Sequence, residues 1–240
     1  MRVITPSVEL KRQWTARVEL ARRHPWWFLL FFVWTCDQHD LVDPIKPTPA
    51  LRPHIKVMSE LWHDNPRLVV VKSRQMLMTW TFVALYLWDA LFHQGRLIMF
   101  QSKREEDAIG DEVSGDGLLG RAKFILSHMP GRQFVIPEYD EAKHKQGRKI
   151  LFPWNNSTIW AIPQGAAIIR QRTASGILSD ESAFQPSAGD AYVAARPCIR
   201  GGGRYTALTT ADMADGGHTR ALYEDTLDQG DYERSGTRTD

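Results

Sequence analysis

A β-branched run, a short polar loop and an apolar segment of helix length follow one another between residues 68 and 93. Residues 68–71, Leu-Val-Val-Val, have the composition of a buried strand, and residues 79–93 have the length of a helix that Gly95 closes. A strand that passes through a short loop directly into a helix points backbone N–H groups and the positive helix end at an anion. The segment therefore predicts an anion site at residues 72–79, within a fold in which strands lead into helices.

The same alternation continues along the chain. Short apolar runs predict strands at residues 96–101, 176–179 and 205–209, and residues 150–153 and 157–162 predict a hairpin around Asn155-Asn156. Residues 103–109 have the acidic start of a further helix. Strands that alternate with helices favour an α/β fold with a mostly parallel sheet covered on both faces, to which the hairpin adds antiparallel strands.

The beginning of the chain has a helical pattern. Residues 8–23 carry apolar side chains at helical spacing, and residues 26–34 are the most apolar run of the sequence. Because a bilayer span needs about 20 apolar residues, we expect residues 26–34 to be a helix packed on the domain, with a membrane-surface or partner-binding helix as the alternative. Residues 43–53 contain four prolines and predict an extended linker, and residues 52–65 predict another helix.

Composition decides little about function. The chain has 240 residues, 43% of them hydrophobic, which suits a globular protein with a sizeable core. The formal net charge of +2 is too small to indicate a nucleic-acid partner by itself. Cys36 and Cys198 lie far apart without metal-ligand spacing, which fits a reduced, intracellular compartment.

The loop at residues 72–79 departs from the general phosphate-binding loop, G-x-x-x-x-G-K-[ST]. Lys72, Leu77 and Met78 stand where that pattern has its two glycines and its lysine, and Thr79 supplies the final hydroxyl. By the general motif alone, a strand end with solvated basic residues is an equally good interpretation.

Two later segments of the sequence support a phosphate-binding role for the loop. Residues 176–178 form a short apolar run that leads to adjacent carboxylates, Asp180 and Glu181. Residues 205–209 form a further run, whose last residue, Thr209, is followed by Thr210. An adjacent acidic pair is common on protein surfaces and threonine is a good strand residue, so it is their order after the loop that favours a functional role.

These motifs resemble those of the large terminase subunits of tailed bacteriophages, the ATPase–nuclease enzymes that package DNA. Ser73-Arg74-Gln75-Met76 followed by Thr79 matches the frame of the terminase loop, and Asp180-Glu-Ser-Ala-Phe184 matches the acidic segment. Some members move the loop lysine to the start of the loop, where Lys72 stands. The resemblance covers residues 40 to 215 and only the N-terminal ATPase part of such an enzyme.

The resemblance implies a fold and a domain organisation. The expected fold is a P-loop NTPase of the ASCE/RecA-like type, a three-layer sandwich around a mostly parallel sheet with an N-terminal helical extension. We expect the helical extension at residues 1–43, the ATPase domain at 44–215, and a polar segment at 216–240 that begins a linker. The nuclease domain is not expected in this chain, which would make it a fragment, a split-gene product or a truncated prophage copy.

The resemblance also implies the site residues. ATP with Mg²⁺ is expected to bind a set of loop residues, which are Lys72, Ser73, Arg74, Gln75, Met76, Leu77, Met78 and Thr79. Thr79 and Asp180 would hold Mg²⁺, Glu181 would activate the attacking water, and Lys72 and Arg74 would contact phosphate. Thr209 or Thr210 would sense the γ-phosphate, and Arg170 or Arg172 could stabilise charge on the transferred phosphoryl group. His54 or Trp62 could stack on the base, although core packing suits Trp62 better.

The implied function is an ATP-driven motor that moves double-stranded DNA into a procapsid. Its expected partners are the portal protein, the small terminase subunit and further copies of itself in a ring, in the cytoplasm of the infected bacterial host and without a membrane. DNA phosphates could contact a basic stretch, which comprises Lys143, Lys145, Arg148 and Lys149. Two alternatives remain: a helicase-like nucleic-acid-dependent ATPase, which needs a second RecA-like domain, and a non-catalytic terminase-like assembly module.

Overall fold

The computed structural model describes residues 8–48, 52–73, 76–136 and 138–210. Its helices are α1 (Val8–Arg23), α2 (Pro25–Phe32), α3 (Pro53–Asp64), α4 (Met78–Phe92), α5 (Glu105–Ile109), α6 (Leu118–His128), α7 (Arg132–Val135), α8 (Glu141–His144), α9 (Ala167–Gln171), α10 (Ala188–Arg200) and the 3₁₀ helix η1 (Ser182–Phe184). Its strands are β1 (Trp34–Cys36), β2 (Ile45–Pro47), β3 (Arg67–Lys72), β4 (Leu97–Gln101), β5 (Lys145–Gln146), β6 (Lys149–Phe152), β7 (Ser157–Ala161), β8 (Gly176–Ser179) and β9 (Arg204–Thr210).

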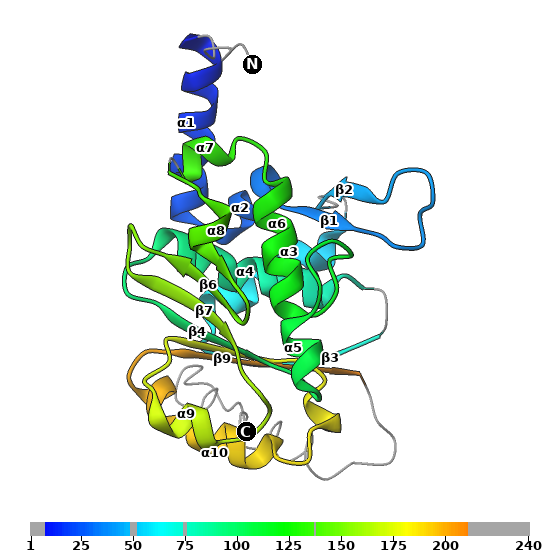
Figure 1. Ribbon diagram of the computed structural model, residues 1–240, viewed down its shortest axis with the longest axis vertical. Coiled ribbons are helices and arrows are strands. Elements are labelled where there is room, and N and C mark those ends of the chain that lie inside the picture. Colours follow the sequence, from blue (N-terminus) through cyan, green and yellow to red (C-terminus); the bar gives the residue numbers. More distant parts are fainter. Residues whose placement is uncertain (1–7, 49–51, 74–75, 137, 211–240) are drawn as a thin grey trace, which may run out of the picture.

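A seven-stranded sheet with the order β3-β9-β8-β4-β7-β6-β5 forms the centre of the fold. The pairings from β3 to β7 are parallel, and β6 and β5 continue the sheet with antiparallel pairings. Figure 1 shows α9 and α10 below the sheet and α2, α3, α4 and α6 above it. The expected α/β architecture, three layers around a mostly parallel sheet with an added hairpin, is confirmed.

Alternate residues of the central strands supply two separate cores. Ile98 and Phe100 of β4 join the core under α4 and α6, whereas Met99 between them joins the core under α9 and α10. In β8, Leu178 and Ile177 divide in the same way. Side chains of a strand point alternately to opposite faces, so a strand buried on both faces has a continuous apolar sequence. That property made these strands recognisable in the sequence.

The helix after the loop, α4, lies inside the molecule. Every residue from Met78 to Leu91 except Thr79 is buried. The hydroxyl of Tyr86 contacts both neighbouring strands, because it donates to the carbonyl oxygen of Ile177 in β8 and lies 2.9 Å from Thr206 Oγ1 in β9. Helix α4 is therefore fixed to the two strands that lead to the acidic pair and to the threonines.

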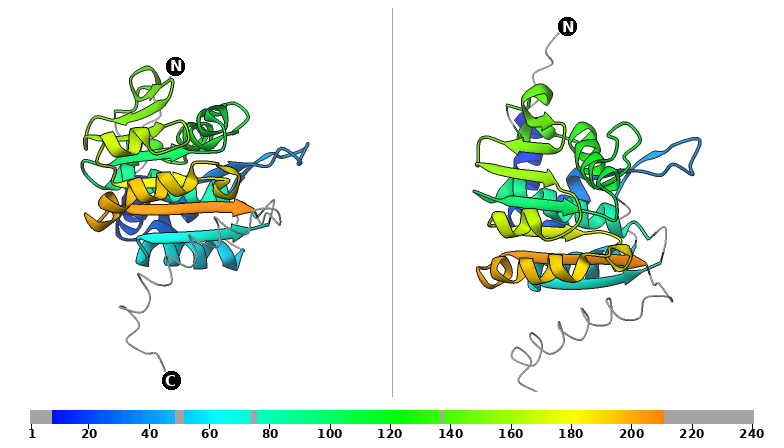
Figure 2. Two further views of the ribbon diagram at one scale, coloured as in Figure 1. Left: turned by 90° about the horizontal axis from the view of Figure 1, so that it is seen from below. Right: turned by 60° about the horizontal axis from the view of Figure 1, so that its bottom comes forward.

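The N-terminal part contains more than helices. Helix α2 packs Phe28, Leu29 and Phe32 into the same core as α4, as expected for a helix packed on the domain. Strands β1 and β2 then form a two-stranded antiparallel hairpin that projects from the molecule (Figures 1 and 2). The expected linker at residues 43–53 therefore contains strand β2. The expected boundary between residues 43 and 44 falls in the connection of this hairpin, and the domain limits stay a prediction.

No helix among the described residues has the length and apolar character needed to cross a bilayer. The expected polar segment at residues 216–240 lies outside the described residues.

Gly176 tests the packing between α4 and the sheet. A Cβ atom at this position would lie 2.6 Å from Cε1 and 3.0 Å from Cδ1 of the buried Tyr86 ring. We expect Gly176→Ala to lower the free energy of unfolding by about 1–3 kcal/mol, the usual cost of overpacking a core, as measured by urea denaturation. Gly147→Ala is the matched control, because a Cβ atom there meets nothing within 4 Å. Equal stability of the two variants would contradict the described packing.

Candidate functional site

The carboxyl ends of β3, β9 and β8 meet at one edge of the sheet. Lys72 is the last residue of β3 and pairs in register with Thr210, the last residue of β9. Asp180 and Glu181 follow directly after β8, which pairs in parallel with β9. Residues from three separated segments of the sequence are thereby placed side by side, as the order of motifs predicts.

Three contacts join these residues. Thr79 Oγ1 donates to Asp180 Oδ2 at 3.1 Å, across 101 residues of sequence. Lys72 Nζ donates to Glu181 Oε1 at 3.4 Å, and Thr210 Oγ1 donates to Glu181 Oε2 at 3.3 Å. The pair of carboxylates is thus held by the loop lysine, the loop threonine and the last threonine of β9.

Asp180 is a buried carboxylate with an altered acidity. Burial raises the pKa of Asp180 and the neighbouring charge of Glu181 raises it further, while Lys72, Arg121 and the hydrogen bond from Thr79 oppose the rise. Its second oxygen accepts a hydrogen bond from the backbone N–H of Glu181 at 3.1 Å. A desolvated carboxylate of this kind is stabilised by a cation, so the site is suited to a metal ion or to a cationic partner.

Thr209 connects the acidic segment to β9. Its buried hydroxyl accepts a hydrogen bond from the N–H of Ala183 at 3.2 Å and donates to the carbonyl of Thr210 at 3.0 Å. Ala183 belongs to η1, the turn that follows Glu181. Thr210 therefore contacts the acid, and Thr209 holds the turn behind it.

The loop backbone is strained where the general motif has a glycine. Leu77 has φ 57° and ψ 17°, the left-handed conformation that glycine adopts without cost. It precedes the first residue of α4 and provides no side-chain cap. Met78, in place of the usual lysine, is buried in the core. Arg74 and Gln75 lie outside the described residues, so their expected roles stay predictions.

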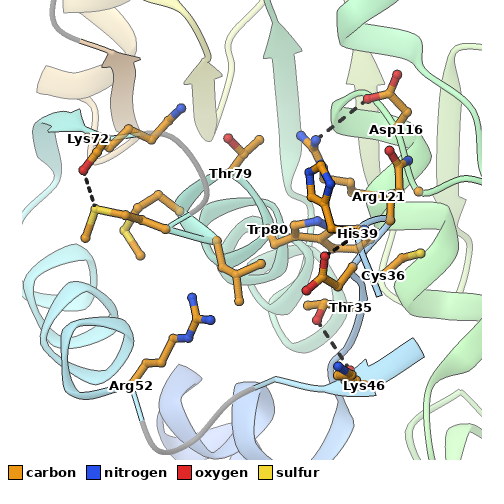
Figure 3. A pocket seen from close by; sticks show the side chains of 17 residues that line it. Thr35, Cys36, His39, Lys46, Arg52, Lys72, Thr79, Trp80, Asp116 and Arg121 are labelled. Atoms are coloured by element: carbon orange, nitrogen blue, oxygen red, sulfur yellow. Dashed lines mark hydrogen bonds and ion pairs between the residues drawn. The ribbon is translucent and has the colours of Figure 1, made fainter. Parts of the chain in front are cut away.

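A cavity of about 610 Å³ lies beside the loop. Its lining residues are Thr35, Cys36, Asp37, Gln38, His39, Lys46, Arg52, Lys72, Ser73, Met76, Leu77, Met78, Thr79, Trp80, Gly115, Asp116 and Arg121. Figure 3 shows Lys72, Thr79 and Arg121 on one side of the cavity and Arg52 and Lys46 on the other. Lys46 and Arg52 come from the segment just before His54, one of the two candidate base-stacking residues.

The two candidate base-stacking residues have different places. Trp62 is fully buried against Tyr86 and Trp88, so it packs in the core. The imidazole of His54 lies 3.3 Å from the carbonyl oxygen of Met76 and so contacts the loop.

Sequence reasoning missed three parts of the cavity wall. They are the β1–β2 hairpin, the turn containing Gly115 and Asp116, and Arg121 at the start of α6. The side chain of Arg121 is 21% exposed and lies 3.8 Å from the carboxylate of Asp116. No motif marks these residues, because they belong to elements that follow or precede the loop at a distance in the sequence and reach the cavity only through tertiary packing.

The structure does not bring Arg170 and Arg172 to the acidic pair. Both are exposed, and Arg172 precedes β8 whereas Asp180 follows it. The carbonyl of Arg172 contacts Cys198 at the end of α10. Within one chain these arginines therefore do not reach the site.

The basic stretch at residues 143–149 is paired with carboxylates of the same chain. Lys145 forms ion pairs with Glu112 and Glu141, and its side chain is only 7% exposed. Arg148 forms an ion pair with Glu105. This pairing reduces the positive charge that the stretch could offer to DNA phosphates.

The oxygen atoms at the site fit Mg²⁺ better than a transition metal. Thr79 Oγ1 and Asp180 Oδ2 lie close together, and both are hard donors of the kind that Mg²⁺ uses alongside water and phosphate. Within the described ranges, no group of three or more histidine, cysteine, aspartate or glutamate residues could hold a metal ion.

Comparison with known proteins places the fold. No protein-family model and no curated protein sequence matches the chain. The HK97 bacteriophage large terminase matches it with a TM-score of 0.57 and 14% sequence identity, over 88% of this chain and 42% of that one. A mutant of the Thermus phage P74-26 large terminase ATPase domain matches with a TM-score of 0.43 and 13% identity, over 67% of this chain and 64% of that one. The chain therefore shares the fold of part of the HK97 large terminase and spans less than half of that protein's length.

The buried carboxylate of Asp180 gives a prediction on stability. Because its pKa is raised in the folded protein, the folded state binds the proton more tightly than the unfolded state. Stability is therefore lost as the pH rises from the ordinary aspartate pKa through the raised one. We expect Asp180→Asn to raise the melting temperature by a few degrees at neutral pH, in thermal unfolding without nucleotide or metal ion. The gain should vanish at a pH below the ordinary aspartate pKa, and a gain independent of pH would contradict this account.

Proposed function

We propose that this chain is the ATP-hydrolysing motor domain of a viral DNA-packaging enzyme. The observation that carries the proposal is the meeting of Lys72 and Thr79 with Asp180 and Glu181 beside the cavity. A loop cation, a loop hydroxyl and two carboxylates at adjacent strand ends are the groups that phosphoryl transfer to water requires. The fold shared with a large terminase supports the same function.

The residues divide the work of ATP hydrolysis. Lys72 would bind phosphate oxygens, and Thr79 and Asp180 would hold Mg²⁺, which would neutralise charge on the phosphates. Glu181 orients a water molecule and accepts its proton as the water oxygen bonds to the γ-phosphorus. The bond from the γ-phosphorus to the bridging oxygen breaks, and ADP and phosphate leave.

Nucleotide binding competes with the contacts seen around Glu181. Lys72 donates to Glu181, and its side chain is only 10% exposed. Phosphate oxygens must therefore replace the Glu181 carboxylate as the partner of the Lys72 ammonium group. The freed Glu181 can then turn to water, and its contact with Thr210 changes. Thr209 ties the following turn to β9, which gives a path from the γ-phosphate to the part that grips DNA.

The wider setting extends the same proposal. The motor would move double-stranded DNA into a procapsid in the host cytoplasm, together with portal protein, small terminase subunit and further copies in a ring. Since Arg170 and Arg172 are exposed and away from their own acidic pair, they would act on the nucleotide of a neighbouring copy. DNA phosphates would compete with the carboxylates that now pair with the basic stretch at residues 143–149.

A second candidate is a non-catalytic assembly module with the same fold. Leu77 in a left-handed conformation and Met78 buried in place of a lysine favour it, because both remove features of the general loop. A helicase-like ATPase would use the same residues and differ in acting with a second RecA-like domain.

Hydrolysis separates the motor from the assembly module. We expect Glu181→Gln to keep ATP binding and to lower kcat by about 10²–10⁴, because it removes the proton acceptor. Lys72→Ala should weaken ATP binding itself. For both variants, the measurements are the rate of DNA-stimulated phosphate release and the affinity for ATP, with portal protein present. Folded wild-type protein that shows no turnover under these conditions would exclude the motor.

Leu77→Gly tests the strained loop. Glycine removes the cost of the left-handed conformation and lets phosphate approach the backbone more closely. We expect Leu77→Gly to bind ATP more tightly than Leu77→Ala, because phosphate can approach a backbone without a Cβ atom more closely. Leu77→Ala is the control, because it shortens the side chain and keeps the strain. Equal affinity of the two variants would show that the backbone conformation is irrelevant to binding.

A further inference from the structure

Arg121 occupies a position that the ATPase motifs do not account for. It lies in the first turn of α6 and lines the cavity that contains Lys72 and Thr79. Figure 3 shows Lys72 and Arg121 on opposite sides of Thr79, which comes from the start of α4. Two cations thus flank the hydroxyl that donates to Asp180.

The charge of Arg121 is only weakly compensated. Its guanidinium lies 3.8 Å from the carboxylate of Asp116, which is 72% exposed and therefore well solvated. Its Nε is buried and has no hydrogen-bond partner within the part of the chain that the structure describes. The guanidinium carbon lies over the ring of Trp80, 5.5 Å from the ring centroid.

Burial without a close counter-charge is costly for a cation. It lowers the pKa of the Arg121 guanidinium, against the opposing charges of Asp180 and Asp116. An anion that entered the cavity would supply the missing partner, and a planar guanidinium matches the oxygens of a phosphate with two parallel hydrogen bonds. The environment of Arg121 is therefore that of an anion-binding group.

The loop itself lacks the cation that would otherwise stand next to Thr79. Met78 occupies that place and is buried, so the residue next to Thr79 brings no charge, and Arg121 of α6 is the cation that lies on this side of the hydroxyl. We propose that Arg121 is a further phosphate-binding cation of the site, opposite Lys72, and exchanges Asp116 for the phosphates of the nucleotide. This inference rests on the proposed function, and it assigns a role to a residue outside every recognised motif.

A purely structural Arg121 would behave differently. It would stack on Trp80 and attach the turn at Asp116 to α6, so that its loss would lower stability and affect all ligands alike. A phosphate contact instead depends on the number of phosphates in the ligand. The affinity for ATP relative to adenosine therefore separates the two roles.

The test is the affinity of the full chain for ATP, ADP and adenosine, measured by titration calorimetry. We expect Arg121→Gln to weaken ATP binding by about tenfold to a hundredfold, the loss typical of a hydrogen bond to a charged group, and to change adenosine binding by less than about twofold. Arg121→Lys should lie between wild type and Arg121→Gln. Asp116→Asn should bind ATP at least as tightly as wild type, because the competing carboxylate is gone.

Controls separate this inference from the proposed function. Arg200→Gln, an exposed arginine at the end of α10, removes the same charge away from the cavity and should leave all three affinities unchanged. If Arg121→Gln does not fold, Arg121→Lys decides the question with its melting temperature as a check. Equal weakening of ATP and adenosine binding, or no weakening while Lys72→Ala abolishes ATP binding, would overturn the role of Arg121 alone. Wild-type protein that binds no ATP would overturn the proposed function as well.

Discussion

The parallel register of β3, β9 and β8 is the constraint on which the site depends. It sets Lys72 opposite Thr210 and brings the acidic pair beside both, although these residues come from distant parts of the sequence. No helix or loop could make this arrangement alone, because it requires three strand ends at one edge of a sheet. The loop threonine then completes the group by its hydrogen bond to Asp180.

Two of the central positions are held in an unfavourable backbone conformation. Leu77 has φ 57° in the loop, and Glu181 has φ 52° after β8. Strain of this kind persists only where the surrounding packing imposes it, and it is concentrated at functional sites in many proteins. Here the buried helix α4 fixes one side of the loop, and the turn held by Thr209 fixes the other side of the acid. Two unfavourable backbone conformations beside the same site indicate that the geometry of the site has been selected at the expense of stability.

The sequence predicted most strands of the central sheet and the place of the acidic segment after β8 well, and it predicted the cavity poorly. The central strands β4 and β8 were recognisable because burial on both faces gives continuous apolar runs, and β8 was located to the residue. The β1–β2 hairpin has strands of only three residues, which leave no periodic pattern to detect. Helix α6 begins directly after Gly117, whose backbone lies so close to that of Gly110 that neither position has room for a Cβ atom. The place where α6 begins therefore depends on tertiary packing. The sequence did not identify Arg121 as a site residue either, because its role follows from the charges and the burial that surround it in the folded protein.

The buried hydroxyl of Tyr86 has a mechanical consequence. It attaches α4 to β8 and β9 at once, in a helix that has no solvated face over its first fourteen residues except at Thr79. Such a helix can neither rotate nor slide without breaking contacts on all sides. Helix α4 and strands β8 and β9 therefore form a rigid unit. We expect any movement that begins at the loop to displace the β1–β2 hairpin and the other walls of the cavity relative to this unit.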